Sequence, residues 1–308
     1  MPEGHTIHRL AEDHLRLFGG RPVRVSSPQG KFTDSAALLD GQVLTTVDAH
    51  GKHLFLGFGD AGSDEEKAGA GADGDADAGS GSGALGWVHV HLGLFGKVAL
   101  GDTPAPPPTD TVRLRLVNDT AYMDLRGPTT CALITAPEKR AIHDRLGPDP
   151  LRVCDGDAVR GDARGDGAGN DGEKAWARIS RSRTTVAALL MDQKVIGGVG
   201  NVYRAEVLFR QGIDPYRAGK DLTRSEWDAI WADLVMLMRE GVRHNRIDTV
   251  RPEHTPEAMG RPPRVDDHGG EVYVYRRANL PCLLCGTDIR TAPLAARNLF
   301  WCPGCQRR

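Results

Sequence analysis

The second and third residues of the chain, Pro2 and Glu3, are of types that could support covalent catalysis. Proline is small enough at position two for the initiator Met1 to be removed, which would expose a secondary amine. An α-amino group titrates at about pH 7.7–8, so a sizeable fraction is unprotonated and nucleophilic at neutral pH. Attack of this amine on C1′ of a sugar would give an iminium ion, with Glu3 beside it as an acid or base. Met-Pro-Glu is a common opening, so other motifs must support the prediction.

Four cysteines near the end of the sequence have the spacing of a zinc site. The predicted ligands are Cys282, Cys285, Cys302 and Cys305. Sixteen residues separate the two Cys-x2-Cys pairs, which is enough for one β-hairpin. Four thiolates leave no open position on a tetrahedral ion, so we expect one structural Zn²⁺. A redox pair or incidental cysteines are the alternatives, and such zinc ribbons occur in many nucleic-acid-binding proteins.

A glycine-rich loop lies between two apolar stretches, where Gly197, Gly198 and Gly200 come shortly before Asn201. Glycine permits positive φ and a close approach by a partner. The loop amides, leading into a helix expected to begin near Asn201, could form a seat for a phosphate group. A glycine-rich helix connection without a ligand is the alternative, and the residues alone favour neither.

A helix and several short strands must position the N-terminal residues. An amphipathic helix is expected at 6–18, and the apolar residues that follow it alternate with polar residues, as in short strands. The predicted strands are 23–26, 42–49, 53–58, 87–92, 97–100, 112–117 and 121–125. Their alternation and short turns indicate a β-sandwich or a barrel-like domain.

Helical periodicity replaces the strand pattern in the second half of the chain. Apolar spacing predicts helices at 184–193, 201–210 and 225–242. Residues 245–270 are polar and contain prolines, which indicates a mobile linker, and 272–275 have the pattern of a short strand. The predicted fold class is therefore α+β, with an N-terminal β-sandwich domain, a helical helix-two-turn-helix domain and a C-terminal zinc-finger β-hairpin.

The predicted domain boundaries follow these changes in pattern. The domains are 1–137 for the catalytic β-sandwich, 138–173 for a linker, 174–255 for the DNA-binding helical domain and 271–308 for the zinc finger.

Charge is distributed unevenly along the chain. Two Gly- and Ala-rich acidic segments, 60–85 and 155–173, have almost no large apolar side chains, so we predict that they are flexible. They carry −6 and −4, which leaves +8 on the rest of a chain whose net charge is −2. A basic folded part suits a polyanion, although soluble Arg-rich surfaces are equally common. Without an 18-residue apolar run or a signal-peptide pattern, we expect no membrane association and a cytoplasmic, nucleoid-associated protein.

Five motifs, taken in order, resemble the formamidopyrimidine-DNA glycosylase/endonuclease VIII family over essentially the whole chain apart from the acidic segments. The motifs are Pro2-Glu3-Gly4, His50-Gly51-Lys52-His53-Leu54, His91-Leu92-Gly93-Leu94-Phe95-Gly96, Leu190 to Tyr203, and Phe300-Trp301-Cys302-Pro303-Gly304-Cys305-Gln306. The resemblance implies a bifunctional DNA glycosylase and AP lyase of base excision repair. Such an enzyme acts on damaged double-stranded DNA, and we expect a monomer.

The resemblance also implies catalytic roles for four residues. Pro2 would be the Schiff-base nucleophile and Glu3 the proton donor during base release. Lys52 would be a proton donor in β-elimination, with a surface lysine at a strand start as the alternative. Arg297, at the tip of the zinc-finger hairpin, would hold the phosphates that flank the lesion and assist δ-elimination, because its guanidinium pairs with two phosphate oxygens.

Five further residues would contact the DNA by the same resemblance. His91 and Asn201 match contacts to the DNA backbone, and Arg126 matches one arginine of a family triplet. Leu94 and Phe95 would fill the gap that an extruded nucleotide leaves, as in the endonuclease VIII branch. For these two residues, a buried position within a hairpin is the alternative.

Two departures from the family pattern bear on the choice of base. An Arg-Arg-Phe triplet is replaced by the stretch Asp124 to Pro128, which lacks the intercalating aromatic residue, and a second carboxylate in the opening motif is replaced by Thr6. Both disfavour 8-oxoguanine and favour oxidised pyrimidines, abasic sites or hydantoin-type lesions. The alternative functions are a non-catalytic nucleic-acid-binding protein or damage sensor, and a lyase that acts mainly on abasic DNA. Pure binding would not need Pro2, Glu3 and Lys52.

Overall fold

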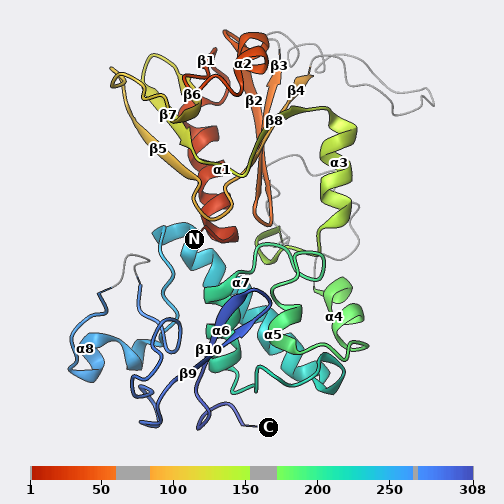
Figure 1. Cartoon of the computed structure of the whole chain (residues 1–308), viewed down its shortest axis with the longest axis vertical. Coiled ribbons are helices and arrows are strands. Elements are labelled where there is room, and N and C mark those ends of the chain that lie inside the picture. The colour runs from red at the N-terminus through yellow and green to blue at the C-terminus, as the bar shows by residue number, and fades with distance from the viewer. Residues whose placement is uncertain (1, 60–83, 153–171, 266–269, 308) are drawn as a thin grey trace, which may run out of the picture.

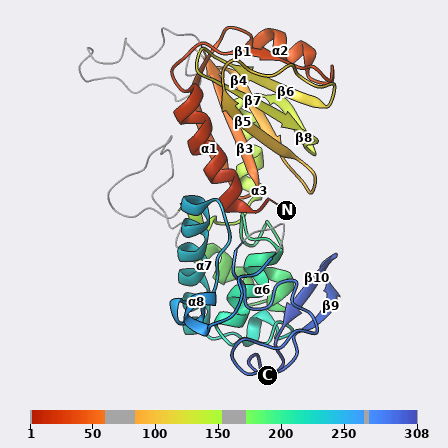
Figure 2. The same cartoon turned by 90° about the vertical axis from the view of Figure 1, so that its left-hand side faces the viewer.

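The protein has two lobes, a β-rich lobe at the N-terminal end and a helical lobe that carries a C-terminal hairpin (Figure 1, Figure 2). The computed structural model describes residues 2–59, 84–152, 172–265 and 270–307. Most of both acidic segments lies outside the described residues, so their flexibility stays a prediction. The N-terminus lies at the junction of the lobes (Figure 1).

Helix α1 (Gly4–Phe18) begins at the junction and runs along the β-rich lobe (Figure 1). Its buried side chains Ile7, His14 and Phe18 share one face because they are seven and four residues apart. Gly19 ends the helix, and its N–H donates to the carbonyl of Leu15. The helix therefore begins slightly before the predicted residue 6 and ends as predicted.

Two four-stranded antiparallel sheets pack face to face in the β-rich lobe, which confirms the predicted sandwich. Their strand orders are β1-β6-β7-β5 and β2-β3-β4-β8. The strands are β1 (Arg24–Ser26), β2 (Val43–His50), β3 (His53–Gly59), β4 (Ala84–His91), β5 (Lys97–Asp102), β6 (Val112–Val117), β7 (Ala121–Arg126) and β8 (Thr130–Ile134). Leu56 and Val88 of one sheet share a hydrophobic core with Leu114 and Met123 of the other.

Three elements of this lobe were not predicted: α2 (Thr33–Leu39), β8 and α3 (Ala136–Arg145). Strand β8 is half-buried throughout, so it lacks the alternation of a strand with one exposed face. Helix α3 buries no residue fully and begins at a capping box formed by Thr135 and Glu138. It occupies the start of the segment that we expected to be a linker, where apolar periodicity is weak.

Helix α6 (Asn201–Arg210) is the centre of the helical lobe, and its residues are buried from Asn201 to Phe209. Its bounds match the prediction, and α7 (Arg224–His244) matches the predicted long helix. The helix predicted at 184–193 is shorter, because α5 (Val186–Leu189) ends before a turn at Asp192. The remaining elements are α4 (Glu173–Ile179) and the 3-10 turns η2 (Pro150–Arg152) and η3 (Gly219–Asp221).

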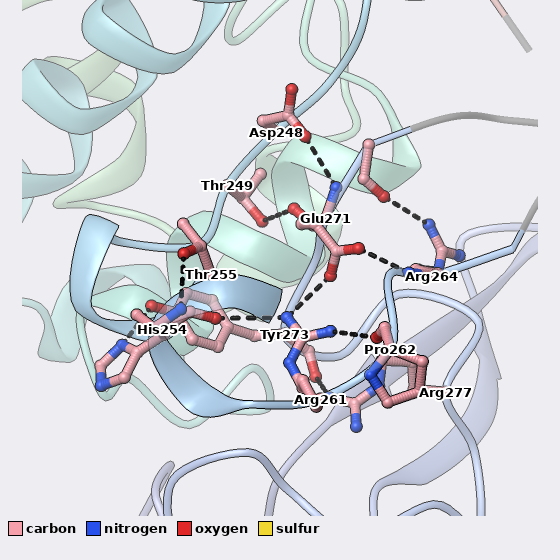
Figure 3. A network of polar contacts seen from close by, with 12 residues as sticks. Asp248, Thr249, His254, Thr255, Arg261, Pro262, Arg264, Glu271, Tyr273 and Arg277 are labelled. Atoms are coloured by element: carbon pink, nitrogen blue, oxygen red, sulfur yellow. Dashed lines mark hydrogen bonds and ion pairs between the residues drawn. The ribbon is translucent and has the colours of Figure 1, made fainter.

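Polar contacts hold the described part of residues 245–270, the segment that we expected to be a mobile linker (Figure 3). It contains η4 (Pro252–His254) and α8 (Pro256–Met259). Arg261 pairs with Glu271 at 2.7 Å, and the N–H of Glu271 donates to Asp248 at 2.7 Å. Polar composition alone does not show that these groups bond to one another, and the mobility of the segment stays a prediction.

The stretch 272–275 does not form the predicted strand. The N–H groups of Tyr273, Val274 and Tyr275 donate to the buried carboxylate of Glu206 on α6, at 2.7–2.8 Å. A carboxylate thus takes the place of the neighbouring strand that these amides would otherwise need.

The C-terminal hairpin consists of β9 (Arg290–Leu294) and β10 (Arg297–Trp301), as the spacing of the cysteines predicted. Ala295 and Ala296 form its turn with φ of 53° and 56°. Arg297 is therefore next to the tip of the hairpin, and the four cysteines lie at the opposite end.

Candidate active site at the junction of the lobes

The carboxylate of Glu3 lies on the N-terminal end of α6. It is fully buried and accepts hydrogen bonds from the N–H groups of Gly200 (3.0 Å), Val202 (2.8 Å) and Tyr203 (3.4 Å). A Cβ at position 200 would lie 2.3 Å from Cδ of Glu3, so only glycine permits this approach. The first residues of the chain are thereby fixed to the helical lobe, with the half-buried Pro2 beside them.

Burial shifts the protonation of the two charged side chains at this junction. Desolvation raises the pKa of Glu3 above its usual value, although Lys52 and the three amides act in the opposite direction. Desolvation lowers the pKa of Lys52, opposed by the negative charge of Glu3. A carboxyl group with a raised pKa can hold a proton for donation, which is the property of a general acid.

Lys52 is held by a turn between β2 and β3. Its Nζ donates to the carbonyl of Val199 at 2.7 Å, so it is not a free surface lysine. Gly51 has a positive φ of 60° and donates its N–H to the buried carboxylate of Asp149 at 2.6 Å. Asp149 also accepts from His8 at 2.8 Å. Sequence reasoning missed Asp149 as a positioning residue, because nothing local connects it to a turn 98 residues away.

Three N–H groups of the glycine-rich loop donate to acceptors within the protein, so they are not free to bind a phosphate group. The N–H of Gly197 donates to the carbonyl of Pro148 (2.9 Å), and that of Gly198 donates to Oε1 of Gln193 (3.1 Å). The N–H of Gly200 donates to Glu3. This loop therefore joins the N-terminus, the Lys52 turn and α6 by close backbone packing.

The hairpin carrying Arg297 is attached to the same end of α6. Asn201 donates from Nδ2 to the carbonyl of Asn298 at 2.9 Å and accepts from Arg204 through its Oδ1. The fully buried Arg204 also donates to the carbonyl of Leu294 at 3.3 Å. Desolvation by burial lowers the pKa values of Lys52 and Arg204, and the positive charge of Arg297 lowers them further. The structure thus brings Glu3, Lys52 and Arg297 together from three distant parts of the sequence.

A pocket of about 420 Å³ opens beside Pro2. Its wall includes His5, Thr6 and Leu94 from the β-rich lobe, together with Arg264 and Tyr275 from the segment after α7. Sequence reasoning missed this second wall, because residues 245–270 had been interpreted as a linker and 272–275 as a strand.

The predicted wedge residues occupy the turn between β4 and β5. Leu94 is 46% exposed and Phe95 is 82% exposed, so neither is a core residue of the hairpin. His91 precedes this turn, and burial lowers its pKa, which favours the neutral imidazole. Arg126 lies on β7 and pairs with Asp124 at 2.8 Å. The DNA contacts of these residues and of Asn201 stay predictions.

The four cysteines form a site that fits a metal ion. Their sulfur atoms all lie within 4.8 Å of one another. The Sγ atoms of Cys282 and Cys305 are 3.8 Å apart, and those of Cys285 and Cys302 are 3.4 Å apart. A tetrahedral ion with Zn–S bonds of about 2.3 Å spaces its sulfurs about 3.8 Å apart. The donor set and its spacing therefore suit a closed, structural metal site.

Comparisons with known proteins agree with this geometry. The models of the N-terminal domain and of the H2TH domain of formamidopyrimidine-DNA glycosylase match residues 1–131 and 168–251. Endonuclease 8 1 of Mycobacterium tuberculosis is 46% identical over 310 residues, which cover 99% of this chain and 100% of the relative. The chain belongs to the formamidopyrimidine-DNA glycosylase/endonuclease VIII family. It is a DNA glycosylase with AP lyase activity, on the endonuclease VIII side of the family.

More distant relatives support the same assignment. Formamidopyrimidine-DNA glycosylase of Pseudomonas putida is 30% identical to this glycosylase, and the match covers 100% of the chain and 99% of the relative. The Lactococcus lactis enzyme in complex with abasic-site DNA has a TM-score of 0.68 at 17% identity, with 99% and 100% coverage. MutM bound to DNA containing carbocyclic 8-oxoguanine also has a TM-score of 0.68, at 16% identity and full coverage of both chains. These two structures show that the fold is shared.

The described helices of the glycosylase include none with both the length and the apolar character to cross a membrane.

Proposed function

We propose that the enzyme excises oxidised bases, preferentially pyrimidines, from damaged duplex DNA through a Schiff base on Pro2, and then cleaves the strand by β- and δ-elimination. The observation that carries this proposal is the buried Glu3 on the end of α6, next to Pro2 and coupled to Lys52. A protein that only bound DNA could use Glu3 to hold the end of α6, but it would not need a carboxyl group with a raised pKa beside an N-terminal amine.

Base release needs a nucleophile and an acid. After removal of Met1, the secondary amine of Pro2 attacks C1′, and the bond between C1′ and the base nitrogen breaks. Glu3 provides the proton that accompanies departure of the base, and the amine loses its own proton. The electron pair of the amine then forms the iminium as the bond between C1′ and O4′ breaks, so that the sugar ring opens and O4′ takes up a proton. The raised pKa of Glu3 supports its role as the acid.

Strand cleavage follows because the iminium at C1′ acts as an electron sink for the eliminations. Loss of a proton from C2′ drives departure of the 3′ phosphate, and a second elimination releases the 5′ phosphate. Lys52 donates a proton in the first elimination, and Arg297 holds the flanking phosphates and assists the second. The proximity of Lys52 to Glu3 and Arg297 supports this assignment.

The preference for pyrimidines is supported by the end of β7. Asp124 is buried and accepts from both Arg115 (2.6 Å) and Arg126 (2.8 Å). Gly127 then turns the chain with a φ of 59°, so no aromatic residue is presented there. The exposed Phe95 on the neighbouring turn is the aromatic side chain available for insertion.

Incision of three duplexes tests this proposal. One carries an oxidised pyrimidine, one carries 8-oxoguanine and one carries a preformed abasic site, with otherwise identical sequence. We expect release of the pyrimidine to be fastest among the damaged bases, and borohydride should trap protein on the DNA. Strand cleavage confined to the abasic duplex would identify a lyase without base excision and refute the proposal.

We also propose that the metal held by the cysteines is Zn²⁺. Cys302→Ser should lose the metal and lower strand cleavage by about a hundredfold, because the hairpin that carries Arg297 loses its anchor. Metal analysis and incision assays measure the two effects. The matched control is Cys131→Ser, which removes a half-buried thiol of β8 outside the cluster and should retain both. Full activity of Cys302→Ser without metal would contradict the prediction.

Replacing Leu94 and Phe95 together by Ala should lower excision of a paired damaged base about ten- to hundredfold, with little effect on abasic-site cleavage. Extrusion from a stacked duplex costs a few kcal/mol, whereas an abasic sugar has no base to unstack. Single-turnover rates on both duplexes provide the measurement. Leu38→Ala is the control, since Leu38 is 64% exposed on α2. Equal losses on both substrates would indicate a packing role.

A further inference from the structure

The turn that carries Lys52 is tied to residues 147–149 by the two residues that precede Lys52. The N–H of Gly51 donates to the carboxylate of Asp149 at 2.6 Å. Nε2 of His50 lies 3.0 Å from the carbonyl oxygen of Gly147. Because a carbonyl oxygen only accepts, Nε2 must carry the hydrogen and donate it. Both ends of this short segment therefore hold the backbone and the side chain just before Lys52.

The other nitrogen of His50 connects the turn to helix α3. Its Nδ1 lies 3.0 Å from Nδ1 of His143. Desolvation by burial lowers the pKa of His50 to about 4, so its imidazole is neutral at physiological pH. A neutral imidazole that donates through Nε2 accepts through Nδ1, so His143 is the donor of this hydrogen bond. A directed chain thus runs from His143 on α3 through His50 to the carbonyl of Gly147.

Helix α3 is held on the sheet by polar side chains, since it buries no residue fully. It extends from the β-rich lobe toward the helical lobe (Figure 1). Lys139 pairs with Asp48 of β2 at 2.9 Å, and its Nζ lies 3.5 Å from the ring centroid of Trp87 on β4. Asp48 also accepts from Arg152 of η2 at 2.5 Å and lies 3.3 Å from Nε2 of His143. His143 is four residues after Lys139, so both side chains share the face of α3 that contacts the sheet.

The Lys52 turn has little freedom on its other side. A Cβ at Gly51 would lie 3.1 Å from the backbone nitrogen of Gly198, so the turn is packed against the glycine-rich loop. Nζ of Lys52 donates to the carbonyl of Val199 in that loop at 2.7 Å. A displacement of the turn would therefore move the amine relative to its partner. Misplacement of a catalytic group by about 1 Å can lower a rate about a hundredfold.

We propose that His143, acting through His50, is a positioning residue for Lys52, so that the docking of α3 sets the rate of strand cleavage. The inference rests on the proposed function, because it requires Lys52 to donate a proton during elimination. Neither histidine is in the lining of the pocket beside Pro2, so they act through Lys52 and not on the DNA in that pocket. A hydrogen bond suits this task because it fixes orientation as well as distance.

The test uses a duplex with a preformed abasic site and two single-turnover measurements. His143→Phe keeps a ring against Phe55, whose centroid lies 5.0 Å from that of His143, and removes the donor nitrogen. We expect strand cleavage to slow about tenfold, with KM unchanged. Borohydride trapping should stay within about twofold of wild type, because formation of the iminium requires Pro2 and not Lys52. A general loss of folding would lower both quantities.

Two further variants examine the hydrogen bond itself. His143→Asn, whose amide nitrogen can occupy the position of Nδ1, should retain most of the cleavage rate. His50→Phe should slow cleavage about as much as His143→Phe. The double variant should lose no more than the larger of the two single losses, because both substitutions remove the same bond.

His14→Phe is the matched control. His14 is buried on α1, and its Nδ1 donates to the carbonyl of Leu10 at 2.6 Å, so it contacts neither α3 nor the Lys52 turn. It should retain both trapping and cleavage, and thermal melting should compare the folding of all variants. Unchanged cleavage by His143→Phe and His50→Phe, or equal losses of trapping and cleavage, would overturn the inference. Full strand cleavage by Lys52→Ala would instead refute the role of Lys52 in the proposed function.

Discussion

Protein that retains Met1, or that carries an N-terminal extension, should lose both base release and strand cleavage by at least about a thousandfold. The reason is chemical, because elimination at C3′ needs an electron sink at C1′. A protonated imine supplies this sink, whereas the hemiacetal left by simple hydrolysis does so only weakly. An amide nitrogen at Pro2 cannot form an imine. Incision assays on lesion-bearing and abasic duplexes, with mass spectrometry of the N-terminus, measure the effect.

The matched control for this experiment is the same protein after removal of its extension, which leaves Pro2 at the N-terminus. Pro2→Gly should keep a primary amine and therefore some borohydride trapping at an altered rate. Peptide mapping of the trapped wild-type complex should place the adduct on residue 2. An adduct on Lys52, or full activity with Met1 present, would move the nucleophile to a lysine and falsify the assignment of Pro2.

Glu3→Gln should lower base release by about 10²- to 10⁴-fold, the range typical for loss of a general acid. Lyase activity on a preformed abasic site should be retained in part, because no base has to leave.

Glu3→Gln should also lower the stability of the protein, since Glu3 accepts hydrogen bonds through both of its oxygens. A glutamine NH₂ would face at least one backbone N–H, so unfolding should require about 1–3 kcal/mol less free energy. Single-turnover kinetics and denaturant melts separate the two effects.

Glu138→Gln provides the control for Glu3→Gln. Glu138 also accepts a backbone N–H, that of Thr135 at 2.8 Å, but it is exposed at the start of α3. Its replacement should leave base release unchanged.

The rate of base release by the wild-type enzyme should decrease as pH rises through the raised pKa of Glu3, because the proton is then lost. Normal base release by Glu3→Gln would show that another group donates the proton.

Local patterns in the sequence were sufficient for much of the fold. The bounds of α6 follow from apolar spacing within a single helix, and the seven predicted strands follow from short apolar or alternating stretches between turns. The zinc-finger hairpin could be predicted because its cysteines are close in sequence and each pair forms its own turn. In all these cases, the residues that define the element lie within about one element's length of one another.

The site depended on contacts that leave no local pattern. Glu3 meets the amides of α6 about 200 residues later in the chain, and Asp149 meets the Gly51 turn 98 residues earlier. Glu206 turned an expected strand into the ordered wall of a pocket, because a carboxylate can satisfy amides that a sequence pattern assigns to a sheet. The sequence by itself determined which groups could do the chemistry. The packing of two lobes around α6 decided which of them are buried together, and desolvation there shifts the pKa values of Glu3 and Lys52.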